Sequence, residues 1–234
     1  VRHDDRDANR RAAAPRGWPV NFAPFRIESA ALTHEGRVRE HNEDSFCARE
    51  PEGLWAVADG MGGHEGGEWA SGEIVRALDE LELPDDLEAA QEAVAGAIQS
   101  ANRRIVAEAR SRSRQMGSTV VSLLLHGTRY AVQWVGDSRA YVLRDSSLIQ
   151  LSRDHSQVQE MVDRGIMRPE DAVDHPMGHI LSRAVGVRDE IAVDLVSGEV
   201  EPGDIFLLCS DGLHGYVPQA DIARLLAHRS PERA

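Results

Sequence analysis

Three aspartates in this sequence of 234 residues share one local pattern, in which an apolar run ends and an aspartate beside a glycine follows. They are Asp59, Asp137 and Asp211. A carboxylate at the end of a buried strand is unfavourable unless a cation meets it. Three such groups in one place would repel one another without cations between them. The pattern therefore predicts a shared cation site, with three solvated surface turns as the alternative.

The residue types around these aspartates narrow the choice of cation. No cluster of cysteine or histidine accompanies them, and ligand sets made of oxygen alone favour Mg²⁺ or Mn²⁺. After Asp59 come Gly60, Gly62, Gly63 and His64. Glycines allow a sharp turn and let a ligand approach the main chain. A metal or phosphate site and an ordinary strand-to-helix turn both remain open for this stretch.

Composition limits the possible partners. The net charge of −13 argues against nucleic acid or an anionic membrane as the main partner. No apolar run approaches the ~20 residues needed to cross a bilayer, so we expect no membrane insertion. All 26 basic residues are arginine, which excludes Schiff-base chemistry and the lysines of P-loop and kinase sites. Anions must therefore be bound by arginine, whose planar fork suits phosphate.

The two cysteines, Cys47 and Cys209, lie in apolar or nearly apolar stretches. Such a pair predicts buried thiols rather than a disulfide framework or a cysteine zinc site. We therefore expect a reducing, cytoplasmic setting, and find no secretory signal at the start of the sequence.

The elements that must position the aspartates follow from periodicity. Residues 1–24 show no periodicity and are expected to form a disordered arm or linker. Residues 25–234 are then expected to form one domain. Strands are predicted at 45–48, 54–58, 118–125, 129–135, 139–143, 148–151, 191–196 and 205–209. Helices are predicted at 68–81, from Pro84 onward with a capping box at Asp85 and Glu88, around 158–165, and at 221–228.

The order of these elements indicates the fold class. Tight turns between neighbouring strands indicate antiparallel pairing. Strands that come in runs and helices that come in blocks indicate an α+β fold rather than alternating βαβ units. Residues 166–180 are expected to form an exposed excursion.

Seven short motifs occur in a fixed order along the chain. They are REHNED at 39–44, ADGMGGH at 58–64, GEWAS at 67–71, GSTVV at 117–121, VGDSRAY at 135–141, LSRAVG at 181–186 and SDGL at 210–213. Together they resemble the successive motifs of the metal-dependent type 2C serine/threonine protein phosphatases, bacterial branch. The resemblance runs from about residue 30 to the C-terminus.

This resemblance implies a four-layer α-β-β-α sandwich, with two antiparallel sheets flanked by helices and metal ions at one end. Asp59 would bridge two ions of Mn²⁺ or Mg²⁺, and the carbonyl of Gly60 would bind one of them. Asp211 would bind the second ion, and Asp44 would support the bound waters. Asp137, with Asp211, matches the position that holds a third ion in bacterial members.

The resemblance also implies a hydrolytic mechanism. Arg39 matches the arginine that binds the substrate phosphoryl group. Two ions about 3.5–4 Å apart lower the pKa of a bridging water. The metal-bridged hydroxide attacks phosphorus in line while Arg39 and the ions stabilise the developing charge. His64 is our candidate for the general acid, and a hydrogen-bonding role in the glycine-rich loop is the alternative.

Two features depart from the family pattern. The family continues to an Asp-Asn pair, whose aspartate binds the second ion, and to a last strand, but no such pair follows Asp211. The chain also begins with Val1. We therefore expect a fragment that is cut at both ends, with a domain that is incomplete at its C-terminus and a sheet edge left uncovered.

The leading hypothesis is hydrolysis of phosphoserine and phosphothreonine on protein substrates, opposing a bacterial serine/threonine kinase. The alternative is a catalytically impaired domain that binds phosphoprotein without turnover. A serine hydrolase is a third hypothesis, because residues 136–140 nearly match a nucleophile elbow around Ser138, with Asp211 and His214 downstream as candidate partners. That motif requires a strand, a turn and a helix, whereas a strand is predicted after Ser138. The other histidines, including His155 and His179, are interpreted as surface or packing residues.

Overall fold

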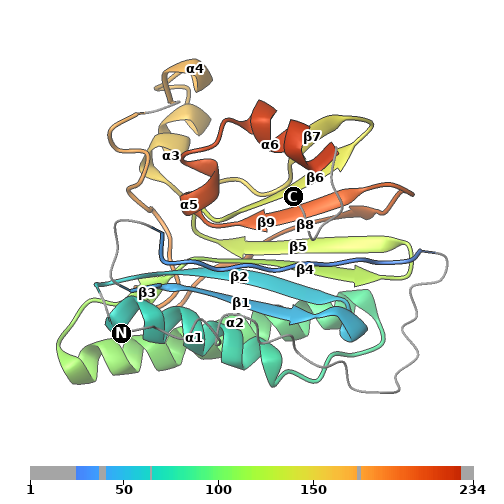
Figure 1. The fold of residues 1–234 in the computed structure, drawn as a ribbon. Helices are drawn as coiled ribbons and strands as arrows, with labels where there is room; N and C mark the ends of the chain where they lie inside the picture. Colours follow the sequence, from blue (N-terminus) through green and yellow to red (C-terminus); the bar gives the residue numbers. More distant parts are fainter. Residues whose placement is uncertain (1–24, 37–40, 64, 173–174, 228–234) are drawn as a thin grey trace, which may run out of the picture.

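The computed structural model describes residues 25–36, 41–63, 65–172 and 175–227. Two antiparallel sheets pack face to face, and helices cover both outer sides (Figure 1). The predicted α+β sandwich of four layers is therefore confirmed. The predicted arm at residues 1–24 lies outside the described residues, and the prediction of a missing last strand stays a prediction.

The larger sheet has the order β1-β2-β4-β5-β8, and the short strand β3 pairs with β2 beyond the end of β4. Its strands are β1 (Asp44–Arg49), β2 (Leu54–Met61), β3 (Gly117–Ser118), β4 (Val120–His126), β5 (Arg129–Val135) and β8 (Asp194–Glu199). Burial alternates along β2 because successive side chains point to opposite faces. Leu54 and Ala56 belong to the core under the helices, whereas Trp55 and Val57 pack into the core between the sheets.

The smaller sheet has the order β7-β6-β9. Its strands are β6 (Arg139–Arg144), β7 (Ser147–Gln150) and β9 (Ile205–Cys209). β6 follows β5 after only three residues, so the chain crosses from one sheet to the other at Gly136–Asp137–Ser138. This crossing places Asp137 between the ends of the two sheets.

Two long helices, α1 (Glu65–Asp79) and α2 (Leu87–Arg112), cover the outer face of the larger sheet (Figure 1). Ile74, Val94 and Ile98 are fully buried there. The short helices α3 (Gln157–Asp163), α4 (Pro169–Ala172) and α5 (Asp211–His214), together with α6 (Gln219–Ala227), lie on the side of the smaller sheet. Among the described residues, every helix is too short or too polar to cross a membrane.

Several predicted boundaries are wrong, and each error has a local cause. β2 continues past Asp59 to Met61, because Gly60 and Met61 pair with β3. The capping box at Asp85 is wrong, because Asp86 caps α2 and its carboxylate accepts a hydrogen bond from the Ala89 amide at 2.9 Å. The strand predicted at 118–125 is divided at Thr119.

Other boundaries also differ from the prediction. α1 begins at Glu65 instead of residue 68 and ends at Asp79, and β8 begins at Asp194 instead of residue 191. The excursion at 166–180 contains the one-turn helix α4. The sequence pattern did not predict α5, since four residues are too few to establish a helical period.

One ion pair joins the smaller sheet to the turn between β8 and β9. Arg144 on β6 donates two hydrogen bonds to Asp204, at 2.8 and 2.5 Å, and one to Glu201 at 2.7 Å. The side chain of Asp204 is only 2% exposed. Burial raises the pKa of the Asp204 carboxyl, but the Arg144 guanidinium outweighs it and leaves this pKa below its usual value.

Replacement of Arg144 by glutamine should destabilise the fold by about 3 kcal/mol, because the carboxylate of Asp204 would stay buried without its charge partner. The matched control is Arg129→Gln, whose pair with Glu88 is exposed on both sides, and which should cost less than about 1 kcal/mol. Urea unfolding followed by circular dichroism measures both. Equal losses from the two variants would show that burial of Asp204 has no energetic consequence.

Candidate metal centre

The pairing of β1 with β2 brings the first two acidic groups together. Asp44 lies directly opposite Asp59 in the antiparallel register, so both side chains lie on the same face of the sheet. Like charges in such opposed positions are destabilising. A cation between them would turn this repulsion into attraction.

The backbone of Asp59 is fixed on its other side by Thr119, which lies between β3 and β4. The Asp59 amide donates to the Thr119 hydroxyl at 3.1 Å, and the Thr119 amide donates to the Asp59 carbonyl at 2.8 Å. Ser118 adds a hydroxyl hydrogen bond of 2.9 Å to the same carbonyl. The break in the strand at Thr119 therefore holds the main chain of Asp59 in place.

Asp137 lies in the crossing between the sheets and is 8% exposed. Gly136 before it has φ +108°, and an added Cβ would lie 2.6 Å from the Thr119 side chain, so only glycine fits this turn. After it, the Ser138 hydroxyl shares a hydrogen bond of 2.6 Å with Thr119. His214 Nε2 donates to the Asp137 carbonyl at 3.0 Å. Thr119 thus links the backbone of the Asp59 strand to the Ser138 side chain in the Asp137 turn.

Asp211 is the first residue of α5 and is separated from β9 by Ser210 alone. The preceding Ser210 donates its hydroxyl to the Asp44 carboxylate at 2.9 Å. This contact joins two segments that are 166 residues apart in sequence. The smaller sheet thereby delivers Asp211 to the end of the larger sheet where Asp44 and Asp59 lie.

The pKa values of Asp59 and Asp137 are both raised at this end of the sandwich. Burial raises the pKa of Asp59 to about 8, with further contributions from the charges of Asp44, Asp211 and Asp137. Burial also raises the pKa of Asp137 to about 7, and the charges of Asp211 and Asp154 raise it further. Both shifts have the same physical cause, since negative charge is concentrated in a space with little solvent.

Gly60 packs too closely to carry a side chain. Its amide donates to the Glu43 carbonyl at 3.0 Å, and an added Cβ would lie 2.1 Å from the carbonyl oxygen of Gly67 on α1. The glycine therefore allows α1 to approach β2, and it has only main-chain atoms to offer to a ligand.

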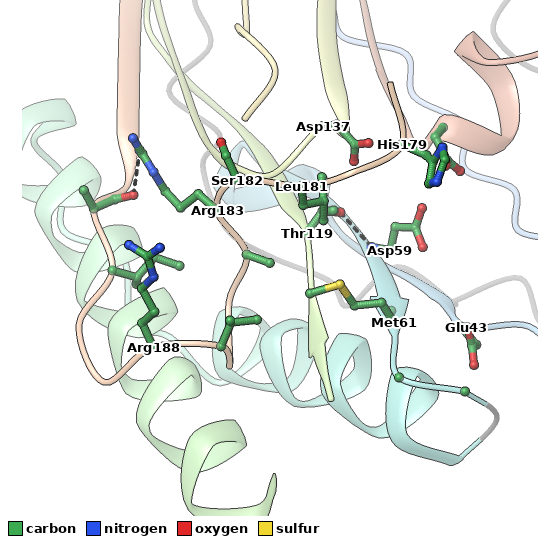
Figure 2. A pocket seen from close by; sticks show the side chains of 18 of the residues that line it. Glu43, Asp59, Met61, Thr119, Asp137, His179, Leu181, Ser182, Arg183 and Arg188 are labelled. Atoms are coloured by element: carbon green, nitrogen blue, oxygen red, sulfur yellow. Dashed lines mark hydrogen bonds between the residues drawn. The ribbon is translucent and has the colours of Figure 1, made fainter. Parts of the chain in front are cut away.

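Asp59, Asp137 and Asp211 line a cavity of about 1090 Å³. Figure 2 shows Asp59, Asp137 and His179 on one side of it and Arg183 and Arg188 on the other. The wall on the arginine side is the segment 181–192. Buried Asn102 on α2 holds this wall, because its amide group donates to the Arg188 carbonyl at 2.8 Å and accepts from the Gly186 amide at 2.7 Å.

The sequence did not predict several residues that line or support this cavity. Thr119 and His179 line it, and His155 is buried behind it with hydrogen bonds at both ring nitrogens. The interpretation of His179 as a surface or packing residue therefore omitted its place in the cavity wall. The hydrogen bonds of Thr119 and His155 are mostly to backbone groups, which impose no characteristic spacing on the sequence.

The donor set fits hard divalent cations, because it consists of carboxylate and main-chain oxygens. Among residues 25–227 as far as they are described, no three acidic, histidine or cysteine side chains form a compact ligand cluster. Magnesium-like ions are usually held by one or two carboxylates and several waters. The arrangement therefore suits ions bound partly through water.

Two predicted catalytic residues, Arg39 and His64, lie outside the described residues, so the structure does not place them. The serine hydrolase hypothesis is wrong in its geometry. Ser138 is followed directly by strand β6, not by a helix, and His214 contacts the Asp137 carbonyl. The Ser138 hydroxyl is paired with Thr119.

Comparison with known proteins gives a consistent result. The family model for protein phosphatase 2C matches residues 33–231. The serine/threonine phosphatase stp of Listeria innocua is 38% identical over 203 residues, which cover 83% of this chain and 81% of that protein. The serine/threonine protein phosphatase PstP of Mycobacterium tuberculosis is 39% identical over 213 residues, 89% of this chain and 40% of that longer protein.

Solved structures agree with these relatives. PppA, described as a key regulatory component of T6SS in Pseudomonas aeruginosa, superposes with a TM-score of 0.81 at 39% identity and covers 87% of this chain and 85% of that one. The catalytic domain of PstP in complex with two manganese ions superposes with a TM-score of 0.76 at 36% identity and covers 87% and 86% of the two chains. The chain therefore belongs to the protein phosphatase 2C family and is a metal-dependent protein serine/threonine phosphatase.

Proposed function

We propose that this phosphatase hydrolyses phosphoserine and phosphothreonine on proteins with two Mn²⁺ or Mg²⁺ ions held at the aspartate cluster. Asp59 would bridge the ions, the Gly60 carbonyl would bind one of them and Asp211 the other, and Asp44 would orient bound water. Asp137, with Asp211, would hold a third ion. The observation that carries the proposal is geometric, since Asp59, Asp137 and Asp211 come from three separate segments and line one cavity.

The chain's own residues perform the remaining tasks. Divalent ions held by these aspartates would lower the pKa of a bridging water, and the resulting metal-bridged hydroxide would be the nucleophile. Arg39 would bind the phosphoryl oxygens through its planar guanidinium. His64 would donate the proton that the departing serine or threonine oxygen needs. The cavity beside the wall 181–192 would hold the peptide around the phosphorylated residue.

A phosphatase of this kind requires substrates that a kinase has phosphorylated. We therefore propose a serine/threonine kinase of the same cell as its counterpart. Both cysteines are unpaired and buried, which supports a reducing, cytoplasmic setting. We also propose that residues 1–24 form an N-terminal arm and that residues 25–234 form the phosphatase domain.

Replacement of Asp59 by asparagine should lower the Mn²⁺-dependent kcat/KM on a phosphothreonine peptide at least about 100-fold, because the bridging carboxylate is lost. The metal-free variant should be at least as stable to heat as the unchanged protein, since one of several mutually repelling carboxylates is removed. Phosphate release and the thermal midpoint measure the two effects.

The matched control is Asp145→Asn, in the exposed turn between β6 and β7, which should leave kcat/KM unchanged. Activity retained by the Asp59 variant would contradict the proposed centre. If the unchanged chain bound Mn²⁺ and phosphopeptide but released no phosphate, the impaired-domain alternative would be favoured.

Replacement of His64 by asparagine should distinguish the general acid from a residue that only shapes the loop. A serine or threonine alkoxide needs a proton to leave, whereas nitrophenolate does not. We expect kcat to fall about 100-fold on a phosphothreonine peptide and less than about tenfold on nitrophenyl phosphate. Steady-state kinetics on both substrates provide the test, and equal losses on the two would exclude the acid role.

A further inference from the structure

The segment 152–155, which runs from β7 towards α3, is anchored beside the turn that carries Asp137. The Ser152 hydroxyl accepts a hydrogen bond from the Ala140 amide at 3.0 Å. Asp154 accepts three hydrogen bonds from the guanidinium of Arg139, at 2.7 to 3.1 Å. These contacts hold the next residue, His155, which is only 8% exposed, against the inner side of the turn.

His155 contacts the turn through both its backbone and its ring. Its amide donates to the Gly136 carbonyl at 2.9 Å, and the Gly136 amide donates to His155 Nδ1 at 3.0 Å. The imidazole also stacks on Trp134, with 6.2 Å between the ring centroids. The residue after Gly136 is Asp137, so these contacts fix the main chain from which that carboxylate projects.

On its other side, His155 contacts the cavity wall. The Ser182 amide donates to the His155 carbonyl at 2.8 Å, and His155 Nε2 lies 3.2 Å from Asp194 Oδ2. Asp194 also binds the guanidinium of Arg183. Ser182 and Arg183 both line the cavity, across from Asp59 (Figure 2).

The protonation of the ring follows from these partners. Because the Gly136 amide is a donor, His155 Nδ1 must accept and carry no proton. The proton is therefore on Nε2, which donates to the Asp194 carboxylate. A neutral imidazole in this tautomer forms a hydrogen bond to the turn of Asp137 with Nδ1 and a hydrogen bond to Asp194 with Nε2.

We propose that His155 is a positioning residue that ties the turn of Asp137 to the Ser182–Arg183 wall of the cavity. Its Nδ1 hydrogen bond orients Asp137 towards a cation. Its Nε2 hydrogen bond holds the Asp194–Arg183 pair in the position in which Arg183 contacts the substrate peptide. The inference rests on the proposed function in taking Asp137 as a metal ligand. Residues that orient a metal ligand typically change metal affinity 10- to 100-fold when replaced.

Three substitutions separate the two hydrogen bonds from simple packing. In His155→Asn the side-chain oxygen occupies the place of Nδ1, so the bond from Gly136 is kept and the bond to Asp194 is lost. In His155→Gln the side-chain nitrogen occupies the place of Nε2, so the opposite bond is kept. His155→Phe keeps the ring that stacks on Trp134 and loses both bonds. Asp194→Asn alters the wall contact from the other side.

The first measurement is amide exchange at Gly136 by NMR in the metal-free protein. Exchange should match the unchanged protein in His155→Asn and be at least about tenfold faster in His155→Gln and His155→Phe. The second is Mn²⁺ binding by calorimetry. The weakest Mn²⁺ site should lose about tenfold in affinity in the Gln and Phe variants and less than about twofold in the Asn variant.

The third measurement is KM for a phosphothreonine peptide. It should rise about fivefold or more in His155→Asn, His155→Phe and Asp194→Asn, and stay within about twofold in His155→Gln. His126→Gln, at the far end of β4, is the control and should change none of the three readouts.

The inference is overturned if the Asn and Gln variants behave alike in all three readouts, or if His155→Phe behaves as the unchanged protein, since His155 would then only fill space. Failure of the proposed function gives a different result. In that case the unchanged protein would bind no Mn²⁺ and release no phosphate, while Gly136 exchange in the metal-free variants would still decide whether His155 holds the turn.

Discussion

Mutual repulsion among carboxylates at one end of the sandwich is the constraint on which the arrangement of the site depends. Asp59 and Asp44 face each other across paired strands, and the charges of Asp137 and Asp211 add to the raised pKa of Asp59. Such a concentration of buried negative charge disfavours folding unless cations offset it. The site would therefore attract divalent ions, and the rest of the fold must keep its carboxylates from moving apart.

Neutral hydrogen bonds to main-chain atoms provide that restraint. Thr119 contacts the backbone of Asp59 and the turn of Asp137 together, and His214 holds the Asp137 carbonyl. Thr119 and His214 add no charge at this place. They therefore hold the carboxylates in position without reducing the negative charge of the site. The close packing of α1 on Gly60 acts on the same strand, since an added Cβ would lie 2.1 Å from the Gly67 carbonyl oxygen.

The sequence predicted the family and the four layers because the aspartate and glycine motifs recur in a fixed order and the strand and helix periods are clear. It located Asp44, Asp59, Asp137 and Asp211, which the structure brings to one end. It missed His155 and Thr119, because a hydrogen bond to a distant backbone group imposes no spacing. It ended β2 too early, because the pairing partner of Met61 lies 56 residues further along the chain.

The most direct test of the central claim is an anomalous-scattering map from a crystal of this chain grown with Mn²⁺. The account predicts two strong peaks between Asp59 and Asp211, with a weaker third peak beside Asp137. Peaks located elsewhere, or none at saturating Mn²⁺ in a crystal whose aspartates are well ordered, would contradict the claim that these carboxylates are gathered to bind metal.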